Sequence, residues 1–97
     1  MTYNFLLSYK LKEGVNKEYF KKSMELIVKD FYKIQDGFIS INMGYNEKEN
    51  IFYEIHVWKS KLFTDDIHKK FMENDICAEQ FGNIDLTSMT MTELNFI

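Results

Sequence analysis

Three side chains that could take part in chemistry alternate along one short segment of the chain. Glu54, His56 and Trp58 lie two residues apart within YEIHVWKS, residues 53–60, a run whose residue types suit a β-strand. Because alternate residues of a strand point to the same face, neighbouring members of this set are expected about 6.5 to 7 Å apart. A carboxylate, an imidazole and an indole N–H are therefore predicted to line one surface.

Two interpretations of this surface are open. If it lines a cleft, Glu54 could orient His56, which could then take a proton from a bound ligand, and Trp58 could supply a wall and an N–H donor. In the alternative, Glu54 and His56 form a hydrogen-bonded pair in a subunit interface, and Trp58 fills the core at the strand end. Buried polar groups are normally paired for such structural reasons.

The remaining candidate residues give weaker signals. His68, the second of two histidines, is expected at the boundary of the apolar face of a helix, about 100° from its centre. No carboxylate lies at ligand spacing from the two histidines, so no metal site is predicted. Cys77 stands alone between Asp75 and Glu79, which predicts an inert thiol without a disulfide and suits a reducing, cytoplasmic compartment. The hydroxyls of Ser88, Thr90 and Thr92 are expected on an exposed strand face rather than in a pocket.

The elements that must position these residues follow from the hydrophobic periodicity. Period-two alternation predicts strands over residues 2–11, 38–45, 51–59 and 86–97. Apolar residues at three- and four-residue spacing predict a helix that is capped by Asn16 and has an apolar stripe reaching Ile34, and a second over residues 61–74, capped by Ser60. Gly37 is placed to take a left-handed conformation before the second strand. That strand is predicted to carry Phe38 on one side and four apolar residues on the other: Ile39, Ile41, Met43 and Tyr45.

The order β-α-β-β-α-β predicts an α+β fold of the ferredoxin-like type. In this sandwich both helices cover one face of a four-stranded antiparallel sheet. The 97 residues suffice for one domain, residues 1–97. Apolar residues on both faces of the strands would leave a large exposed patch in a monomer, so pairing of two sheets into a homodimer is expected.

Composition limits the classes of partner. The net charge is −3 and the lysines are spread along the chain, which argues against a nucleic-acid-binding footprint. The N-terminal apolar run is interrupted by polar residues, so we expect neither a signal peptide nor a membrane span. With 45% hydrophobic residues, the chain has ample material for a core and a subunit interface.

Two motifs resemble one known family. The acidic-Gly-Phe step Asp36-Gly37-Phe38 opens the second predicted strand, and the third ends Tyr53-Glu54-Ile55-His56-Val57-Trp58-Lys59-Ser60. In these features and in element order the chain is similar to the antibiotic biosynthesis monooxygenase group of dimeric α+β barrel proteins, where such a tryptophan ends the third strand. The resemblance implies a homodimer and a small hydrophobic or aromatic ligand.

The family has several branches, and each implies a different function. Its oxygenases act on quinols and polycyclic phenols without a prosthetic group. If the strand face described above binds such a phenol, His56 could take its proton and oxygen would react with the resulting anion. In these enzymes an asparagine precedes the tryptophan by four residues, where this chain has Glu54. The haem-degrading branch, which Val57-Trp58-Lys59-Ser60-Lys61 also resembles, would make His68 an axial haem ligand. There the second helix also carries a tryptophan and the first strand an asparagine; here that helix has no tryptophan and Asn4 is displaced. Other members have no demonstrated activity and imply a ligand-binding or interaction domain.

Overall fold

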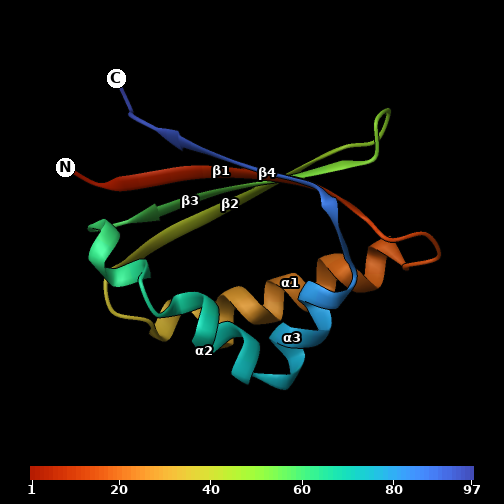
Figure 1. Cartoon of the computed structure of the whole chain (residues 1–97), viewed down its shortest axis with the longest axis horizontal. Coiled ribbons are helices and arrows are strands. Elements are labelled where there is room, and N and C mark those ends of the chain that lie inside the picture. The colour runs from red at the N-terminus through yellow and green to blue at the C-terminus, as the bar shows by residue number, and fades with distance from the viewer.

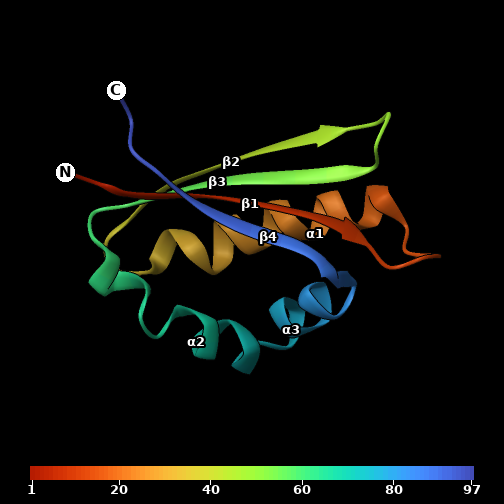
Figure 2. The ribbon, with the colours of Figure 1, turned by 45° about the horizontal axis from the view of Figure 1, so that its top comes forward.

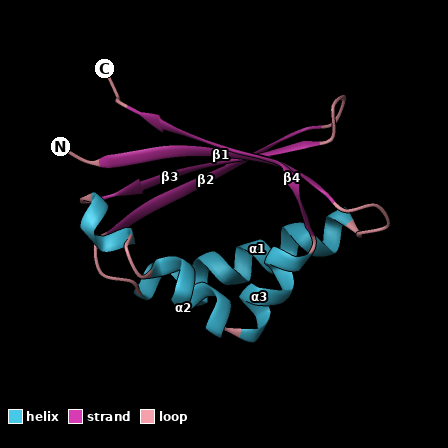
Figure 3. Cartoon of the chain, in the orientation of Figure 1, coloured by secondary structure: helices cyan, strands magenta, loops and turns pink.

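The computed structural model describes all 97 residues, which form a sheet with helices on one side (Figures 1 and 3). Four strands make up the sheet: β1 (Tyr3–Leu11), β2 (Phe38–Asn46), β3 (Ile51–Trp58) and β4 (Ile84–Leu94). Three α-helices pack below it: α1 (Lys17–Asp30), α2 (Ile67–Glu73) and α3 (Asp75–Gly82). Two short 3-10 helices, η1 (Tyr32–Ile34) and η2 (Lys61–Thr64), lie in the connections.

The sheet confirms the predicted ferredoxin-like fold. Its strand order is β2-β3-β1-β4, and every neighbouring pair is antiparallel. The two strands that could carry site residues, β1 and β3, are therefore the central ones. Figure 2 shows all the helices on the same face of the sheet and none on the other face.

The first helix follows the predicted start but not the predicted end. The Asn16 side chain accepts a hydrogen bond from the Tyr19 N–H at 2.9 Å, as expected of an N-cap. The helix ends at Asp30, and the chain turns through η1. The prediction that Ile34 belongs to the buried stripe was wrong, because this turn leaves its side chain 74% exposed.

The side-chain pattern predicted for β2 was also wrong. The pairing with β3 shifts by one residue between Phe38, opposite Trp58, and Ser40, opposite Val57. Such a bulge adds one residue to one strand and breaks the alternation. As a result, Phe38 and Ile41 both face the helices and pack against the core around Trp58, rather than lying on opposite faces.

The helix predicted over residues 61–74 is not continuous. The chain forms η2, then α2, and a further helix, α3, that was not predicted. Ser60 makes no capping hydrogen bond, whereas Asn74 accepts hydrogen bonds from the N–H groups of Ile76 and Cys77 and starts α3. Phe63 does not belong to the expected apolar stripe and packs against Gly37, the residue just before β2.

The core is divided into two clusters between sheet and helices. One is centred on Trp58 and includes Met24, Tyr32 and Cys77; the other joins Tyr9, Phe20, Phe52 and Ile84. Residues from both clusters line the same cavity. The packing therefore leaves a space in the middle of the molecule, with the central strands as its roof.

Candidate functional site

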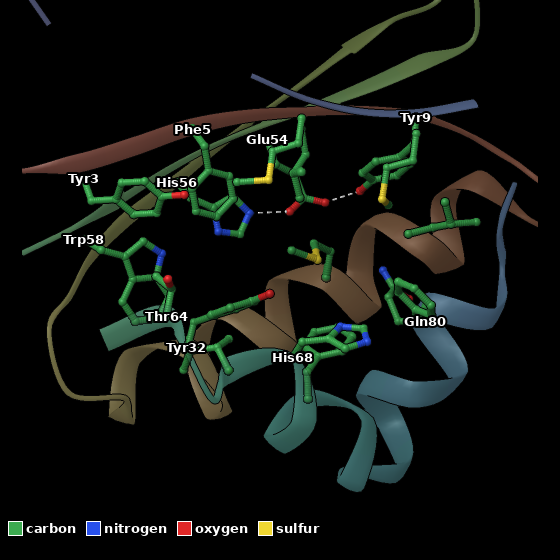
Figure 4. A pocket seen from close by; sticks show the side chains of 18 of the residues that line it. Tyr3, Phe5, Tyr9, Tyr32, Glu54, His56, Trp58, Thr64, His68 and Gln80 are labelled. Atoms are coloured by element: carbon green, nitrogen blue, oxygen red, sulfur yellow. Dashed lines mark hydrogen bonds and ion pairs between the residues drawn. The ribbon is translucent and has the colours of Figure 1, made fainter. Parts of the chain in front are cut away.

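The cavity between the sheet and the helices has a volume of about 330 Å³. Fourteen of its nineteen lining residues are hydrophobic. Figure 4 shows the side chains of Tyr3, Phe5 and Tyr9 from β1 and of Glu54, His56 and Trp58 from β3 reaching down from the sheet, with Tyr32, His68 and Gln80 facing them from the helical layer. A size of this order and an apolar wall with few polar groups are typical of small-molecule sites.

The three residues of the third strand share one face, and that face lines the cavity. Glu54, His56 and Trp58 are 5%, 3% and 1% exposed. Their strand is central, so β1 and β2 flank them on both sides and restrict their movement. The structure therefore places this trio on the helix-facing side of the sheet, and not on the uncovered side where a second sheet could pack.

A hydrogen-bonded chain links two strands at the site. The Tyr9 hydroxyl donates to Glu54 Oε2, and His56 Nε2 lies 2.8 Å from Glu54 Oε1 (Figure 4). If Glu54 is ionised and His56 is neutral, both carboxylate oxygens accept a hydrogen bond and the imidazole proton is on Nε2. The lone pair of the neutral imidazole is then on Nδ1.

Two buried polar atoms of the site have no partner within the protein. They are Nδ1 of His56 and Nε1 of Trp58, one an acceptor in the tautomer above and the other a donor. Both side chains contact the ring of Tyr32 edge-on, with centroid separations of 5.6 Å for His56 and 6.3 Å for Trp58. Since buried polar groups are normally paired, these two atoms are the candidates for hydrogen bonds to a ligand.

The surrounding rings hold the imidazole in place and exclude water. Phe5 stacks on His56 with a centroid separation of 4.5 Å and an interplanar angle of 17°. Burial, followed by the charge of Glu54, raises the pKa of both Tyr9 and Tyr32 above the ordinary tyrosine value. Both phenols therefore stay protonated at neutral pH, and the carboxylate of Glu54 is the negative charge of the site.

The other candidates lie at the edge of the site or outside it. His68 lines the cavity from α2, but its side chain is exposed and packs edge-on to Phe81. Cys77 is fully buried in the core, where burial raises the pKa of its thiol to about 11, so the prediction of an inert thiol is consistent with its surroundings. Thr90 pairs with Ser8 on the uncovered face of the sheet, in agreement with the predicted exposure of its strand face.

The residues match the haem site that the resemblance implies only in part, because His68 lines the cavity but the other two expected residues are not there. Asn4 of β1 points away from the cavity and hydrogen-bonds the Leu94 carbonyl at 3.2 Å. α2 contributes His68 but no tryptophan. No three His, Cys, Asp or Glu side chains come together in a group that could hold a metal ion.

Sequence reasoning missed Tyr9 and Tyr32 as members of the site. Tyr9 was visible only as one apolar residue of an alternating strand, and Tyr32 lies in a 3-10 turn that the helical pattern did not predict. The partner of Tyr9 depends on strand register, which sets Tyr9 opposite Phe52 and so next to Glu54 on the same face. A buried tyrosine hydroxyl needs a partner, and this was the one available signal.

Comparisons with known proteins agree on the fold. No family model and no curated protein matches the sequence. Among solved structures, SnoaB, a cofactor-independent oxygenase from Streptomyces nogalater, is 13% identical and superposes with a TM-score of 0.76, covering 99% of this chain and 93% of that one. A proposed antibiotic biosynthesis monooxygenase from Chloroflexus aurantiacus is 13% identical, with a TM-score of 0.72 and coverage of 100% and 94%.

The chain has the fold of the antibiotic biosynthesis monooxygenase-like proteins. PA3566 from Pseudomonas aeruginosa also superposes, with a TM-score of 0.69 and 9% identity over 99% of this chain and 94% of that one. The likeness extends over the whole chain, so the antibiotic biosynthesis monooxygenase-like fold accounts for all of the described elements. At these identities the likeness carries the architecture, and function has to be argued from the site.

Proposed function

We propose that the chain is a monooxygenase that oxidises a small aromatic phenol or quinol without a prosthetic group. The observation that supports this most is a pair of buried polar atoms without a partner, His56 Nδ1 and Trp58 Nε1, which belong to two residues that line an apolar cavity. A phenolic hydroxyl can donate to the first and accept from the second. The similarity in fold to SnoaB, a cofactor-independent oxygenase, adds support at the level of architecture.

The cavity also limits the size of the ligand. An apolar protein cavity of about 150 Å³ can hold one benzene molecule. The volume here, about 330 Å³, is roughly twice as large. We therefore expect a ligand with about two fused rings, with its hydroxyl at the end near Trp58 and the remainder against the apolar wall.

In the proposed reaction, His56 acts as a general base. Nδ1 takes the phenolic proton, and the Nε2–H donated to Glu54 lets the carboxylate stabilise the imidazolium that forms. The Trp58 N–H donates to the phenolate oxygen, where the negative charge develops. Because the site is buried, these interactions act in a medium of low dielectric constant and are stronger than they would be in water.

Molecular oxygen then serves as the only oxidant. The electron-rich anion adds O2 at a ring carbon that carries hydrogen, and the peroxide takes back the proton from His56. Loss of water from this hydroperoxide breaks the O–O bond and leaves a carbonyl. Phenol and O2 thus give quinone and H2O: one oxygen atom enters the product, the other leaves as water, and the substrate loses two electrons in addition to those that form the new C–O bond.

Oxygen uptake with a panel of one-, two- and three-ring phenols and quinols tests the proposal. We expect uptake by the wild type with at least one two-ring compound, and a loss of about 10²-fold or more in kcat for Glu54→Gln. Glu25→Gln makes the same chemical change at an exposed glutamate of α1 and should keep full activity. If both variants fold and Glu54→Gln is as active as Glu25→Gln, the result would contradict the role of Glu54 and His56 in the reaction.

Two other functions can be distinguished with the same protein and the same panel of phenols. Haem binding predicts a Soret shift with haemin that is lost in His68→Ala, and we expect no such shift, because Asn4 faces away from the cavity. A non-catalytic ligand-binding domain predicts binding of a phenol in the cavity without oxygen uptake by any variant.

A lone, buried Cys77 supports our placement of the protein in the cytoplasm. None of the helices is long and apolar enough to cross a membrane.

We also propose that two copies pair through the uncovered face of the sheet. Leu6 and Ile55 are register partners on this face and remain partly exposed in one chain, as does Tyr53. Sedimentation should detect a dimer that Ile55→Lys converts to a monomer, because a lysine in an apolar interface has no partner for its charge. Ile76→Lys on α3, at an isoleucine 55% exposed on the helical side, should stay dimeric. A monomeric wild type at micromolar concentration would contradict this pairing.

A further inference from the structure

The Tyr9 hydroxyl has one hydrogen-bond partner, the carboxylate of Glu54. Its ring belongs to the second core cluster, packed at centroid separations of 6.0 Å from Phe20 and 5.9 Å from Phe52. The side chain is 1% exposed, and its hydroxyl donates to Glu54 Oε2. A phenylalanine would occupy the same space, so the hydroxyl itself serves the carboxylate and not the packing.

We propose that Tyr9 is a positioning residue that keeps His56 neutral, with its proton on Nε2 and with Nδ1 unprotonated. The role rests on the proposed function, because it describes how the base of that reaction is kept ready. Tyr9 occupies one carboxylate oxygen of Glu54, and His56 Nε2 lies 2.8 Å from the other. With Oε2 occupied by the Tyr9 hydroxyl, Oε1 is left to accept from His56 Nε2–H.

Loss of the Tyr9 hydroxyl has a defined electrostatic consequence. Glu54 Oε2 would be buried without a donor, and its negative charge would be less well stabilised. The Glu54–His56 pair would then hold an additional proton more strongly. An imidazolium carries a proton on both nitrogens, so Nδ1 could no longer take one from a ligand.

The groups around the pair do not replace this effect. Tyr32 of η1 faces His56 edge-on, and Cys77 of α3 lies in the core cluster that also contains Tyr32. Burial raises the pKa of both of these groups, so neither is charged at neutral pH. His68 of α2 is exposed at the edge of the cavity. Glu54 is therefore the charge that faces His56, and Tyr9 is its second hydrogen-bond partner.

Nitrogen-15 NMR of the histidine side chains tests this role without any substrate. Tyr9→Phe is compared with Tyr45→Phe, which removes a hydroxyl from a ring that also packs on Phe52, at 4.6 Å, but whose hydroxyl contacts Lys17 and Asn50. At pH 7 we expect His56 as the Nε2–H form in the wild type and in Tyr45→Phe. In Tyr9→Phe we expect the Nε2–H form to lose its predominance to the doubly protonated imidazolium. His68, the other histidine, serves as the internal reference.

The possible outcomes separate the two claims. The positioning role is refuted if Tyr9→Phe and the wild type give the same His56 signals, or if the wild type carries the proton on Nδ1. If Tyr9→Phe does not fold, the wild-type tautomer remains as the test, because a proton on His56 Nδ1 would by itself refute the role. If the expected NMR shifts occur but no phenol is oxidised, the positioning role stands and the proposed function fails. With an active substrate, Tyr9→Phe should lower kcat at neutral pH with recovery at higher pH and little change in KM.

Discussion

Two glycines have the same backbone conformation, but we expect substitution by alanine to lower the free energy of unfolding by different amounts at the two positions. Gly37 and Gly14 have φ values of +77° and +84°. A Cβ at Gly37 would lie 2.2 Å from Cγ of Phe63, whereas a Cβ at Gly14 would meet nothing within 4 Å. A left-handed alanine costs about 1–2 kcal/mol, and overpacking adds about 1–3 kcal/mol. We expect Gly14→Ala to lower the free energy of unfolding by about 1–2 kcal/mol, and Gly37→Ala by the sum, about 2–5 kcal/mol.

Urea unfolding of both variants at one protein concentration measures the difference. Phe63 directly precedes Thr64, which lines the cavity, so the displacement in Gly37→Ala should also weaken binding of an aromatic ligand. In a Phe63→Ala background two of the three nearest atoms are removed, and the gap between the glycine variants should narrow. Equal losses of stability in Gly14→Ala and Gly37→Ala would refute the packing of Phe63 on Gly37.

Three further predictions concern single side chains. Asn74→Ala should lower the free energy of unfolding, measured in urea, by about 1 kcal/mol, because the cap of α3 is lost. Asp66→Ala, at a position without a side-chain cap bond, should change it by less than about 0.5 kcal/mol. Equal losses in the two variants would contradict the capping role of Asn74. Trp58→Phe removes the unpartnered N–H and should lower kcat/KM for the active phenol about ten-fold in the oxygen-uptake assay; an unchanged value would exclude donation to the substrate. Burial raises the pKa of the Cys77 thiol from 9.0 to about 11, so the stability that the protonated thiol contributes is complete below pH 9 and lost as the pH rises toward 11. The fall in the free energy of unfolding between pH 8 and 10.5 should therefore be smaller in Cys77→Ala than in the wild type. Identical falls in the two proteins would refute the link to Cys77.

The architecture could be predicted because it depends on local periodicity. Alternation located all four strands, and a strand with Glu54, His56 and Trp58 at every second position had to present them on one face. Which face they occupied was not predictable from that strand alone. It was decided by the helices, which pack on the side where Phe52 and Tyr9 join the core.

The errors have causes that act beyond the local pattern. The bulge in β2 arises from its pairing with β3, and the order of apolar and polar residues around Phe38-Ile39 gives no sign of it. The second helix is broken because Phe63 packs on Gly37, 26 residues earlier, and because Asn74 caps a new helix. The contact of Tyr9 with Glu54 joins residues 45 positions apart and depends on the register of two strands. In each case a tertiary contact overrode the local pattern.

The role of His56 as the base is tested most directly by single-turnover oxidation of a bound two-ring phenol by the wild type and by His56→Gln. Binding is measured first under nitrogen, and oxygen is then added to equal amounts of complex. We predict one O2 consumed for each quinone formed by the wild type, and a rate at least about 10²-fold lower in His56→Gln at equal occupancy. Equal rates in the two proteins would contradict the assignment of His56 Nδ1 as the base.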